Sequence, residues 1–205
     1  MENLKISIKK EDKDIKNINY NYYQTNSKEY IEISKTFNMN EFYNFTESII
    51  KNNNFKTILD VGFGSARDML YFKSKDYNIV GVDFCENFVK NAIDNGLEAY
   101  QEILPNFKNI PKNYNFDLIY SVAMIFHLDK KDRIKLFNNL QKKLNDNGII
   151  ILSYTTQNRK NHKDRIFKPL TNKEIEKEIN MIKLDEINMV DKLGTSWCVV
   201  SFKKR

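Results

Sequence analysis

The strongest constraint in this sequence is an apolar segment that runs into two closely spaced glycines and is followed by a second apolar segment ending in an acid. Residues 57–68 read TILDVGFGSARD, and residues 78–84 read NIVGVDF. Glycines let the backbone pass through a turn that a Cβ atom would obstruct, and they expose the first N–H groups of the next helix to a polar or anionic ligand. An acid about 20 residues further on is where an acceptor for ribose hydroxyls belongs. The pattern therefore predicts a strand–turn–helix–strand unit that binds an adenosine-containing cofactor.

The residues around the glycines distinguish between cofactors. A dinucleotide fingerprint has a third glycine where this chain has Arg67, so a nicotinamide cofactor is disfavoured. What is present is Asp60-x-Gly62-x-Gly64-x-Ala66, with an acid two residues ahead of the first glycine. In this respect the chain resembles the class I S-adenosylmethionine-dependent methyltransferases. Ala66 replaces that family's usual third glycine, a mild departure because alanine has the next smallest side chain.

The resemblance continues downstream. Residues 116–121 and 126–128 look like that family's fourth strand and the loop after it, and residues 144–153 look like its passage from a helix into the fifth strand. Together with the first two segments, these matches cover roughly residues 55–155. The resemblance implies an α/β, Rossmann-like fold with a mostly parallel seven-stranded sheet, an antiparallel terminal strand, helices on both faces and a helical lid at the amino end.

The alternation of apolar strands with helical segments is itself the pattern of a parallel sheet covered on both faces. The 205 residues suggest one domain. We divide it into an amino-terminal arm and helical lid (1–55), a cofactor-binding core (56–155), and a carboxyl-terminal loop, helix and β-hairpin (156–205). Residues 1 to about 19 are expected to be a mobile or loosely docked arm. Helices are predicted at about 27–37, 40–52, 65–74, 86–95, 130–144 and 172–180, and strands at about 57–61, 78–83, 97–101, 116–121, 148–154, 182–187 and 197–202.

Composition limits the kinds of partner and cofactor that we expect for this chain. The formal net charge of +6 accompanies a high lysine and asparagine content, and charge alone gives little reason to expect a nucleic acid. Cys85 and Cys198 lie far apart and make neither a metal pair nor a disulfide framework. There is no apolar run of about 18 residues and no signal segment. We expect a cytoplasmic protein without a metal or a membrane partner, acting as a monomer or homodimer.

The resemblance implies cofactor-binding roles for residues at matching positions. Gly62 and Gly64 would let the turn approach the methionine part of S-adenosylmethionine, and Asp60 would meet its amino and carboxylate ends directly or through water. Asp83 would accept both ribose hydroxyls. Phe84 would stack on the adenine, with a plain core position as the alternative.

Four further candidates follow the third and fourth predicted strands. Glu102 resembles the family's acidic position near the adenine amino group, with Ile103 as a backbone contact and apolar wall; a solvated glutamate is the alternative. Ser121 would line the pocket beneath the cofactor. His127 would face the reactive methyl group and could act as a general base, because histidine titrates near neutral pH. It could equally cap a helix or fill space.

The amino-terminal tyrosines resemble the segment that folds over the cofactor in related small methyltransferases. Tyr22, Tyr23 and Tyr30 would form this lid. An aromatic face near a sulfonium offers a cation–π contact worth about 0.5–2 kcal/mol. Ordinary helix packing is the alternative.

Charged residues outside these motifs receive simpler interpretations. Arg67 and Asp68 are expected to orient the first helix of the core. Arg159, His162 and Arg165 could contact an anionic substrate, but a solvated surface loop is the simpler description of their polar segment.

The sequence therefore predicts an S-adenosylmethionine-dependent methyltransferase that acts on an N, O or S nucleophile of a small molecule and forms S-adenosylhomocysteine. Such transfer mainly needs the nucleophile, methyl carbon and sulfur in line and water excluded. A methyltransferase for RNA or protein is an alternative. Residues 121–124 lack the Asn/Asp-Pro-Pro-aromatic stretch typical of amino-directed nucleic-acid enzymes, which disfavours a nucleic-acid acceptor. A catalytically silent cofactor-binding protein is the third reading, and a nicotinamide oxidoreductase is remote.

Overall fold

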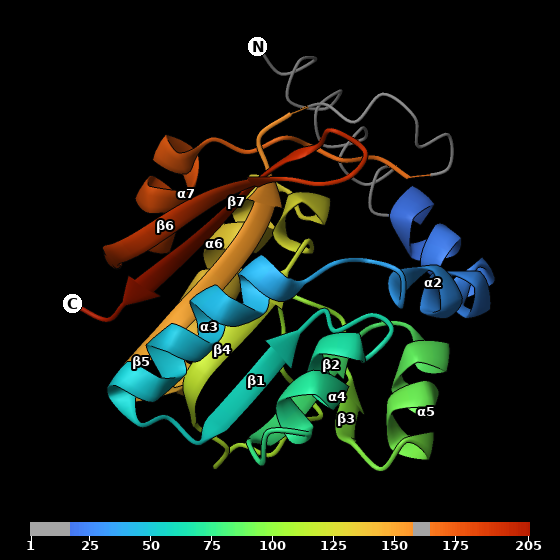
Figure 1. Ribbon diagram of the computed structural model, residues 1–205, viewed down its shortest axis with the longest axis horizontal. Coiled ribbons are helices and arrows are strands. Elements are labelled where there is room, and N and C mark those ends of the chain that lie inside the picture. The colour runs from blue at the N-terminus through green and yellow to red at the C-terminus, as the bar shows by residue number, and fades with distance from the viewer. Residues whose placement is uncertain (1–16, 158–164) are drawn as a thin grey trace.

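The computed structural model describes residues 17–157 and 165–205 (Figure 1). These residues form one seven-stranded sheet in the order β3-β2-β1-β4-β5-β7-β6. Strands β1 to β5 pair in parallel, whereas β7 runs antiparallel to both β5 and β6. The predicted sheet, with an antiparallel strand beside the fifth, is confirmed. The strands are β1 (Thr57–Val61), β2 (Asn78–Asp83), β3 (Glu98–Gln101), β4 (Phe116–Val122), β5 (Leu144–Thr155), β6 (Ile182–Val190) and β7 (Ser196–Lys203).

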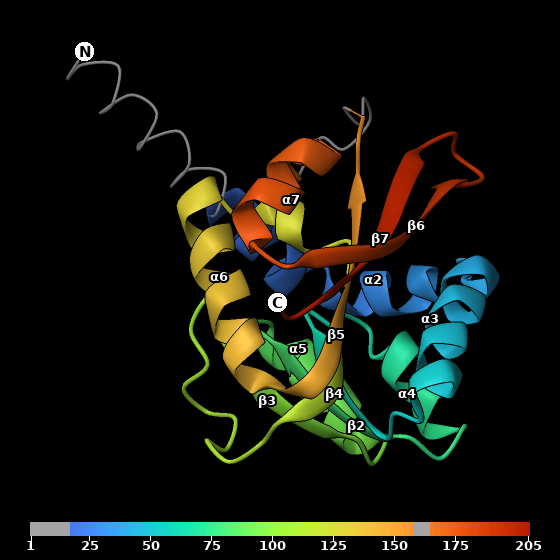
Figure 2. The ribbon, with the colours of Figure 1, turned by 90° about the vertical axis from the view of Figure 1, so that its left-hand side faces the viewer.

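Helices cover both faces of the sheet, as predicted. Helices α6 and α7 lie on one side of β4 and β5, and α3 and α4 lie on the other (Figure 2). Ahead of them, residues 17–25 are also helical. The labelled helices are α2 (Ser27–Ser34), α3 (Asn40–Asn53), α4 (Arg67–Lys73), α5 (Glu86–Asp94), the 3₁₀ turn η1 (Ile125–His127), α6 (Lys130–Lys143) and α7 (Asn172–Ile179).

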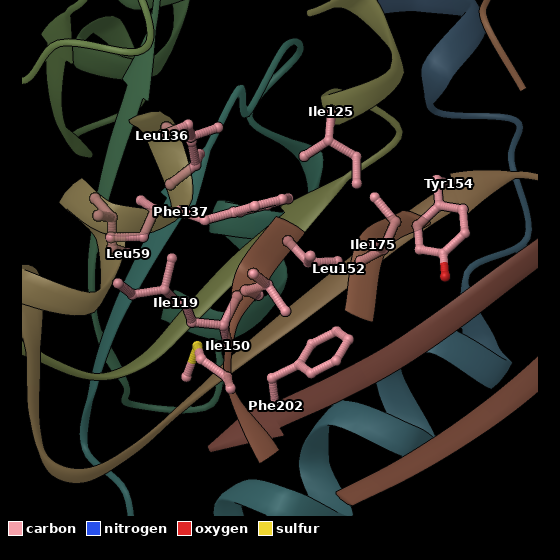
Figure 3. Close-up of a cluster of buried hydrophobic side chains, with 14 of the residues drawn as sticks. Leu59, Ile119, Ile125, Leu136, Phe137, Ile150, Leu152, Tyr154, Ile175 and Phe202 are labelled. Atoms are coloured by element: carbon pink, nitrogen blue, oxygen red, sulfur yellow. The ribbon is translucent and has the colours of Figure 1, made fainter. Parts of the chain in front are cut away.

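Two hydrophobic cores flank the sheet, because successive side chains of a strand point to opposite faces. Leu59 and Ile119 belong to the core beneath α6 and α7, which Figure 3 shows. Their neighbours Ile58 and Leu118 belong to the core beneath α3, α4 and α5. All four side chains are fully buried. Burial on both faces explains why the central strands are almost continuously apolar.

The order of the strands places a ligand site at one edge of the sheet. The chain moves outward from β1 through β2 to β3, then returns to β4 on the other side of β1. Ligands of such sheets bind outside the carboxyl ends of the strands at this reversal. In Figure 1 the arrowhead of β1 points toward α2. This geometry favours a site between the strand ends and the amino-terminal helices.

Some boundaries differ from the prediction. Residues 17–19 are helical although they were predicted within the arm, and the rest of the arm lies outside the described residues. Helix α2 ends at Ser34 rather than near residue 37. Strand β5 begins at Leu144 rather than near residue 148, because Leu144 pairs with Phe116 ahead of an irregularity in the ladder. The turn η1 was not predicted.

Helix α7 begins as the sequence predicts. The Thr171 hydroxyl accepts a hydrogen bond from the Glu174 N–H, and the Glu174 carboxylate accepts one from the Thr171 N–H at 2.9 Å. This capping box satisfies donors that the first turn of a helix leaves unpaired. None of the helices in the described ranges has the length and apolar character needed to cross a membrane.

Close packing of α4 on β2 makes Gly81 a sensitive position. A Cβ atom there would lie 2.6 Å from both Met69 Cε and Phe63 Cδ1, and both side chains are buried. We expect Gly81→Ala to lower the free energy of unfolding by about 1–3 kcal/mol through overpacking. Urea unfolding followed by circular dichroism measures this, and Gly194→Ala, whose added Cβ meets nothing within 4 Å, tests backbone strain alone. An unchanged midpoint for Gly81→Ala would show that the contact is looser.

Candidate active site

The turn between β1 and α4 is built from residues with left-handed backbone conformations. Gly62, Gly64 and Ala66 have φ angles of +75°, +58° and +64°. A Cβ atom on Gly62 would lie 2.5 Å from Met124 Cγ, and one on Gly64 would lie 3.3 Å from Tyr30 Cε1. Glycine is thus needed at both positions, because the φ angles are positive and because a Cβ atom would crowd Met124 or Tyr30. Ala66 adopts the left-handed conformation without being a glycine, at a cost of about 1–2 kcal/mol for an L-residue.

Asp83 ends β2 beside this turn. Its two carboxylate oxygens accept hydrogen bonds from the N–H groups of Gly64 at 3.0 Å and of Cys85 at 2.9 Å. Burial raises the pKa of Asp83 to about 6, although these N–H groups lower it. Each oxygen has a second acceptor position. The carboxylate is therefore suited to receive the two hydroxyls of a ribose.

Asp60 is a buried carboxyl group one residue before the end of β1. Its Oδ2 atom has no hydrogen-bond partner among the described residues. Burial, together with the nearby Asp68 and Asp83, raises the pKa of Asp60 well above its usual value. A buried carboxylate of this kind is stabilised by a cation. The ammonium group of a bound methionine moiety would supply one, so this orphaned oxygen fits S-adenosylmethionine.

Ser121 lies next to the last residue of β4, and Phe84 directly follows β2. The Ser121 Oγ donates to the Val61 carbonyl at 2.9 Å and is fully buried, so Ser121 fixes the end of β1. Phe84 is half-buried, with the ring of Tyr20 centred 5.1 Å away and that of Tyr23 6.2 Å away. An adenine stacked on Phe84 would therefore share this place with Tyr20.

Glu102 and Ile103 lie at the carboxyl end of β3. The buried Glu102 carboxylate accepts hydrogen bonds from the N–H groups of Lys108, Asn109 and Ile110. It is therefore not the solvated glutamate of the alternative reading, and a bond to an adenine amino group would compete with these three. The Ile103 side chain is 64% exposed at this edge.

We call residues 17–34 the lid, and it rests on the start of α5. The Cys85 thiol donates to the Tyr23 carbonyl at 3.5 Å, and the Asn87 amide donates to the Ser27 hydroxyl at 2.9 Å. The buried ring of Tyr23 packs edge-on against Phe88, with centroids 6.2 Å apart. These contacts hold the lid over the carboxyl end of β2.

His127 is bound to the lid through both ring nitrogens. Asn19 Nδ2 lies 3.1 Å from its Nδ1, and Tyr23 Oη lies 3.2 Å from its Nε2. The Asn19 amide is oriented by Ile166, because it donates to the Ile166 carbonyl at 2.9 Å and accepts from the Ile166 N–H at 2.8 Å. Asn19 therefore donates to Nδ1, and Nε2 carries the proton directed at Tyr23. To act as a general base, the imidazole would have to give up its bond with Asn19.

The interpretation of Arg165 as part of a solvated loop is wrong. Arg165 is half-buried, and its guanidinium Cζ lies 4.6 Å from the centroid of the Tyr22 ring. Its Nη1 donates to the Tyr23 hydroxyl at 3.3 Å. The hydrogen bond joins residues 142 positions apart, so local polarity gave no sign of it. Arg159 and His162 lie outside the described residues.

The orienting role predicted for Arg67 and Asp68 matches their contacts. Arg67 Nε lies 2.8 Å from the Asp68 carboxylate, which also accepts a hydrogen bond from the Tyr43 hydroxyl at 2.8 Å. Arg67 Nη1 donates to the carbonyl of Ser34, at 3.3 Å. This network ties the start of α4 to α3 and to the end of the lid.

Three residues of this edge carried little signal in the sequence. Asn19 lies in a polar stretch, and its contacts with His127 and Ile166 are all long-range. Phe167 packs on His127, with centroids 5.2 Å apart. Met124 had a positional signal only, because it lies two residues after the end of β4. No three His, Cys, Asp or Glu side chains converge as a metal site anywhere in the described ranges.

Comparison with known proteins identifies the fold. A family model described as a methyltransferase domain matches residues 58–148. Phosphoethanolamine N-methyltransferase of Plasmodium falciparum is 31% identical over 127 residues, which make up 59% of this chain and 47% of that protein. This chain thus spans about half of that relative.

Two solved structures share the architecture. An S-adenosylmethionine-dependent methyltransferase from Clostridium acetobutylicum matches with a TM-score of 0.68 and 15% identity, over 84% of this chain and 94% of that one. The 1,6-didemethyltoxoflavin-N1-methyltransferase of Burkholderia thailandensis, solved with 1,6-didemethyltoxoflavin and S-adenosylhomocysteine, matches with a TM-score of 0.63 and 16% identity, over 76% and 74%. The matched family model spans the glycine turn, Asp83 and β4. The chain thus carries a methyltransferase domain at residues 58–148 and shares the fold of S-adenosylmethionine-dependent methyltransferases.

Proposed function

We propose that this enzyme methylates an N, O or S nucleophile of a small molecule. We infer the acceptor class from a contact at the carboxyl ends of the strands, where Asn19 of the lid and Ile166 exchange two hydrogen bonds. The lid and the segment after residue 164 thus meet over the strand ends, which suits an acceptor small enough to be enclosed. The names of the Plasmodium and Burkholderia enzymes, which refer to phosphoethanolamine and 1,6-didemethyltoxoflavin, support the same class.

The residues of the turn would hold the cofactor. S-adenosylmethionine supplies a methyl group on a positively charged sulfur. Gly62, Gly64 and Asp60 would receive its methionine part, Asp83 its ribose and Phe84 its adenine. These contacts would fix the donor while the lid excludes water, which is most of what methyl transfer requires.

The lid tyrosines would cover this site. Tyr23 is buried, and Tyr22 and Tyr30 each pack edge-on against it with centroids 5.3 Å apart. Ser121 would support the turn from beneath through its bond to β1. The Glu102 carboxylate would instead shape the edge by holding the loop at residues 108–110. Ile103 would give the adenine a backbone contact and an apolar wall.

We assign His127 a positioning role, because its two ring nitrogens hold Asn19 and Tyr23. We expect His127→Ala to lower kcat by about tenfold or more. Without the imidazole, Asn19 and Tyr23 would lose their fixed positions, and methyl transfer depends on accurate alignment of the reacting groups. The affinity for S-adenosylhomocysteine should stay unchanged, and hydrogen exchange in residues 17–25 should become faster. The pH–rate profile should keep its shape. Loss of its acidic limb would instead identify a general base, and rescue by His127→Gln supports positioning.

We treat residues 1–205 as one domain with an arm and lid (1–55), a core (56–155) and a carboxyl-terminal part (156–205), working in the cytoplasm. We propose that it is a monomer or a homodimer. Light scattering distinguishes the two.

Methyl transfer from S-adenosylmethionine with a labelled methyl group tests the acceptor class. The enzyme is incubated with separate pools of metabolites, RNA and protein from the same cells, and the Asp83→Asn variant serves as the inactive control. We expect label in the metabolite pool only. Label in RNA or protein would overturn the small-molecule assignment. Binding of S-adenosylhomocysteine without label in any pool would indicate a silent cofactor-binding protein.

A further inference from the structure

Two buried oxygens beneath the glycine turn have no hydrogen-bond partner among the described residues. They are Asp60 Oδ2 on β1 and Tyr120 Oη on β4, and Tyr120 is fully buried. Of the four side-chain atoms with this property in residues 17–157 and 165–205, only these two belong to residues paired across adjacent strands. A buried polar group without a partner is costly and therefore rare in folded proteins. A role other than stability would account for both.

The sheet places the two side chains next to each other. Asp60 and Tyr120 are partners in the parallel ladder between β1 and β4, and neighbouring strands lie about 5 Å apart. Tyr120 belongs to the core beneath α3 and α4, where its ring packs edge-on against Phe72 with centroids 5.6 Å apart. Burial, and then the nearby Asp68 and Asp60 carboxylates, raise the pKa of Tyr120 well above its usual value. The Tyr120 hydroxyl therefore keeps its proton and can act as a donor.

The other donors of this polar cluster are directed at a different carboxylate. Arg67 Nε and Nη2 donate to the two oxygens of Asp68 at 2.8 and 3.0 Å. The Tyr43 hydroxyl donates to Asp68 Oδ1 at 2.8 Å. Asp60 receives none of these bonds, so Tyr120 is the hydroxyl that the sheet places to supply one.

We propose that Tyr120 is a positioning residue for the methionine end of the cofactor. In the complex, its hydroxyl donates a hydrogen bond to the Asp60 carboxylate while that carboxylate holds the methionine ammonium group. The bond orients the carboxylate and stabilises its ionised form. This inference rests on the proposed function, in which Asp60 receives the methionine part, and adds a residue of β4 that lies outside the glycine motif.

The test compares two ligands by calorimetry on the full chain. S-adenosylhomocysteine carries the amino-acid part, whereas 5′-methylthioadenosine has the same adenosine and a thioether but neither ammonium nor carboxylate. Tyr120→Phe removes only the hydroxyl. Tyr154→Phe is the matched control, because Tyr154 is also fully buried and its hydroxyl donates to Asn172 from the opposite face of the sheet, at 2.8 Å. Asp60→Asn, alone and combined with Tyr120→Phe, tests whether the hydroxyl acts through the carboxylate.

We expect Tyr120→Phe to bind S-adenosylhomocysteine about tenfold more weakly than the wild type, since a hydrogen bond to a charged group is lost. Its affinity for 5′-methylthioadenosine should stay unchanged, and Tyr154→Phe should bind both ligands like the wild type. In the Asp60→Asn background, the Tyr120 substitution should add little. Equal loss for the two ligands, no loss for either, or the full effect without the Asp60 carboxylate would overturn the inference.

Thermal unfolding of the free protein separates this role from a structural one. Tyr120→Phe removes a hydroxyl that has no bond to lose, so its Tm should equal or exceed that of the wild type. Tyr154→Phe loses a buried bond and should melt at a lower temperature. A Tm of Tyr120→Phe below that of Tyr154→Phe would make the hydroxyl structural and contradict the proposal. Equal affinity of the wild type for the two ligands, or binding of neither, would instead refute the proposed cofactor contacts themselves, and the inference with them.

Discussion

We expect the Asp83→Ala variant to bind S-adenosylhomocysteine about 2–4 kcal/mol more weakly than the wild type, roughly 30- to 1000-fold in Kd. Two hydroxyl groups would lose a charged acceptor, and hydrogen bonds to charged groups contribute about 1.5–3 kcal/mol each. The net loss is smaller than their sum, because the free protein must already keep this carboxylate buried. Isothermal titration calorimetry at pH 8 measures the difference.

The same residue predicts how binding depends on pH. Burial raises the pKa of Asp83 to about 6 in the free protein. Only the ionised carboxylate accepts a hydroxyl hydrogen bond on each oxygen, because in the protonated acid one oxygen carries a hydrogen. Affinity should therefore be constant above about pH 7 and fall by up to about tenfold per pH unit below pH 6. Asp83→Asn should remove this dependence.

The effect on the stability of the free protein has the opposite sign. A raised carboxyl pKa means that the folded state binds its proton more tightly than the unfolded chain does. The stabilisation from protonated Asp83 is fully present below about pH 4 and is lost as the pH rises through about 6. Unchanged affinity of Asp83→Ala, together with a pH-independent Kd for the wild type, would remove Asp83 from the cofactor site.

The largest expected loss of stability follows from Glu178→Ala. Glu178 of α7 and Arg133 of α6 form a two-bond ion pair at 2.8 Å, and their side chains are only 3% and 6% exposed. Arg133 also donates to the carbonyl of Leu128, directly after η1. Removing Glu178 leaves a buried guanidinium without its counter-ion, which typically costs 3–5 kcal/mol, so we expect about that loss in urea unfolding.

Two comparisons separate loss of this pair from a general effect. The double variant Arg133→Met/Glu178→Leu should be far less destabilised, because replacing a buried ion pair by apolar residues is often nearly neutral. Glu176→Ala breaks the half-exposed pair with Lys183 and should cost about 0–1 kcal/mol. A Glu178→Ala variant no less stable than Glu176→Ala would show that the buried pair is dispensable.

The parts of the fold that the sequence predicts are those set by local pattern. The glycines of the turn, the acid ending β2 and the capping box of Thr171 and Glu174 each need a residue type at a fixed spacing. The central strands are recognisable because burial on both faces makes them nearly continuous apolar runs. Their boundaries therefore agree with prediction almost to the residue, as for β1 and β2.

The missing parts are set by contacts between distant segments. Residues 17–25 have few apolar positions at helical spacing, and their helix docks through Tyr23 and Asn19 on partners more than 100 residues away. Arg165 and Glu102 are polar residues in polar stretches, yet one lies against lid rings and the other binds backbone N–H groups. Single-sequence patterns carry no information on such pairings.

The most direct test of the account is a crystal structure with S-adenosylhomocysteine at saturating concentration. We expect this structure to show the ribose hydroxyls bound to the Asp83 carboxylate and the methionine ammonium group bound at Asp60. The turn at Gly62 and Gly64 should contact the ligand. We also expect the ligand sulfur to face His127. A ligand bound elsewhere, or a strand edge that stays empty, would contradict the central claim.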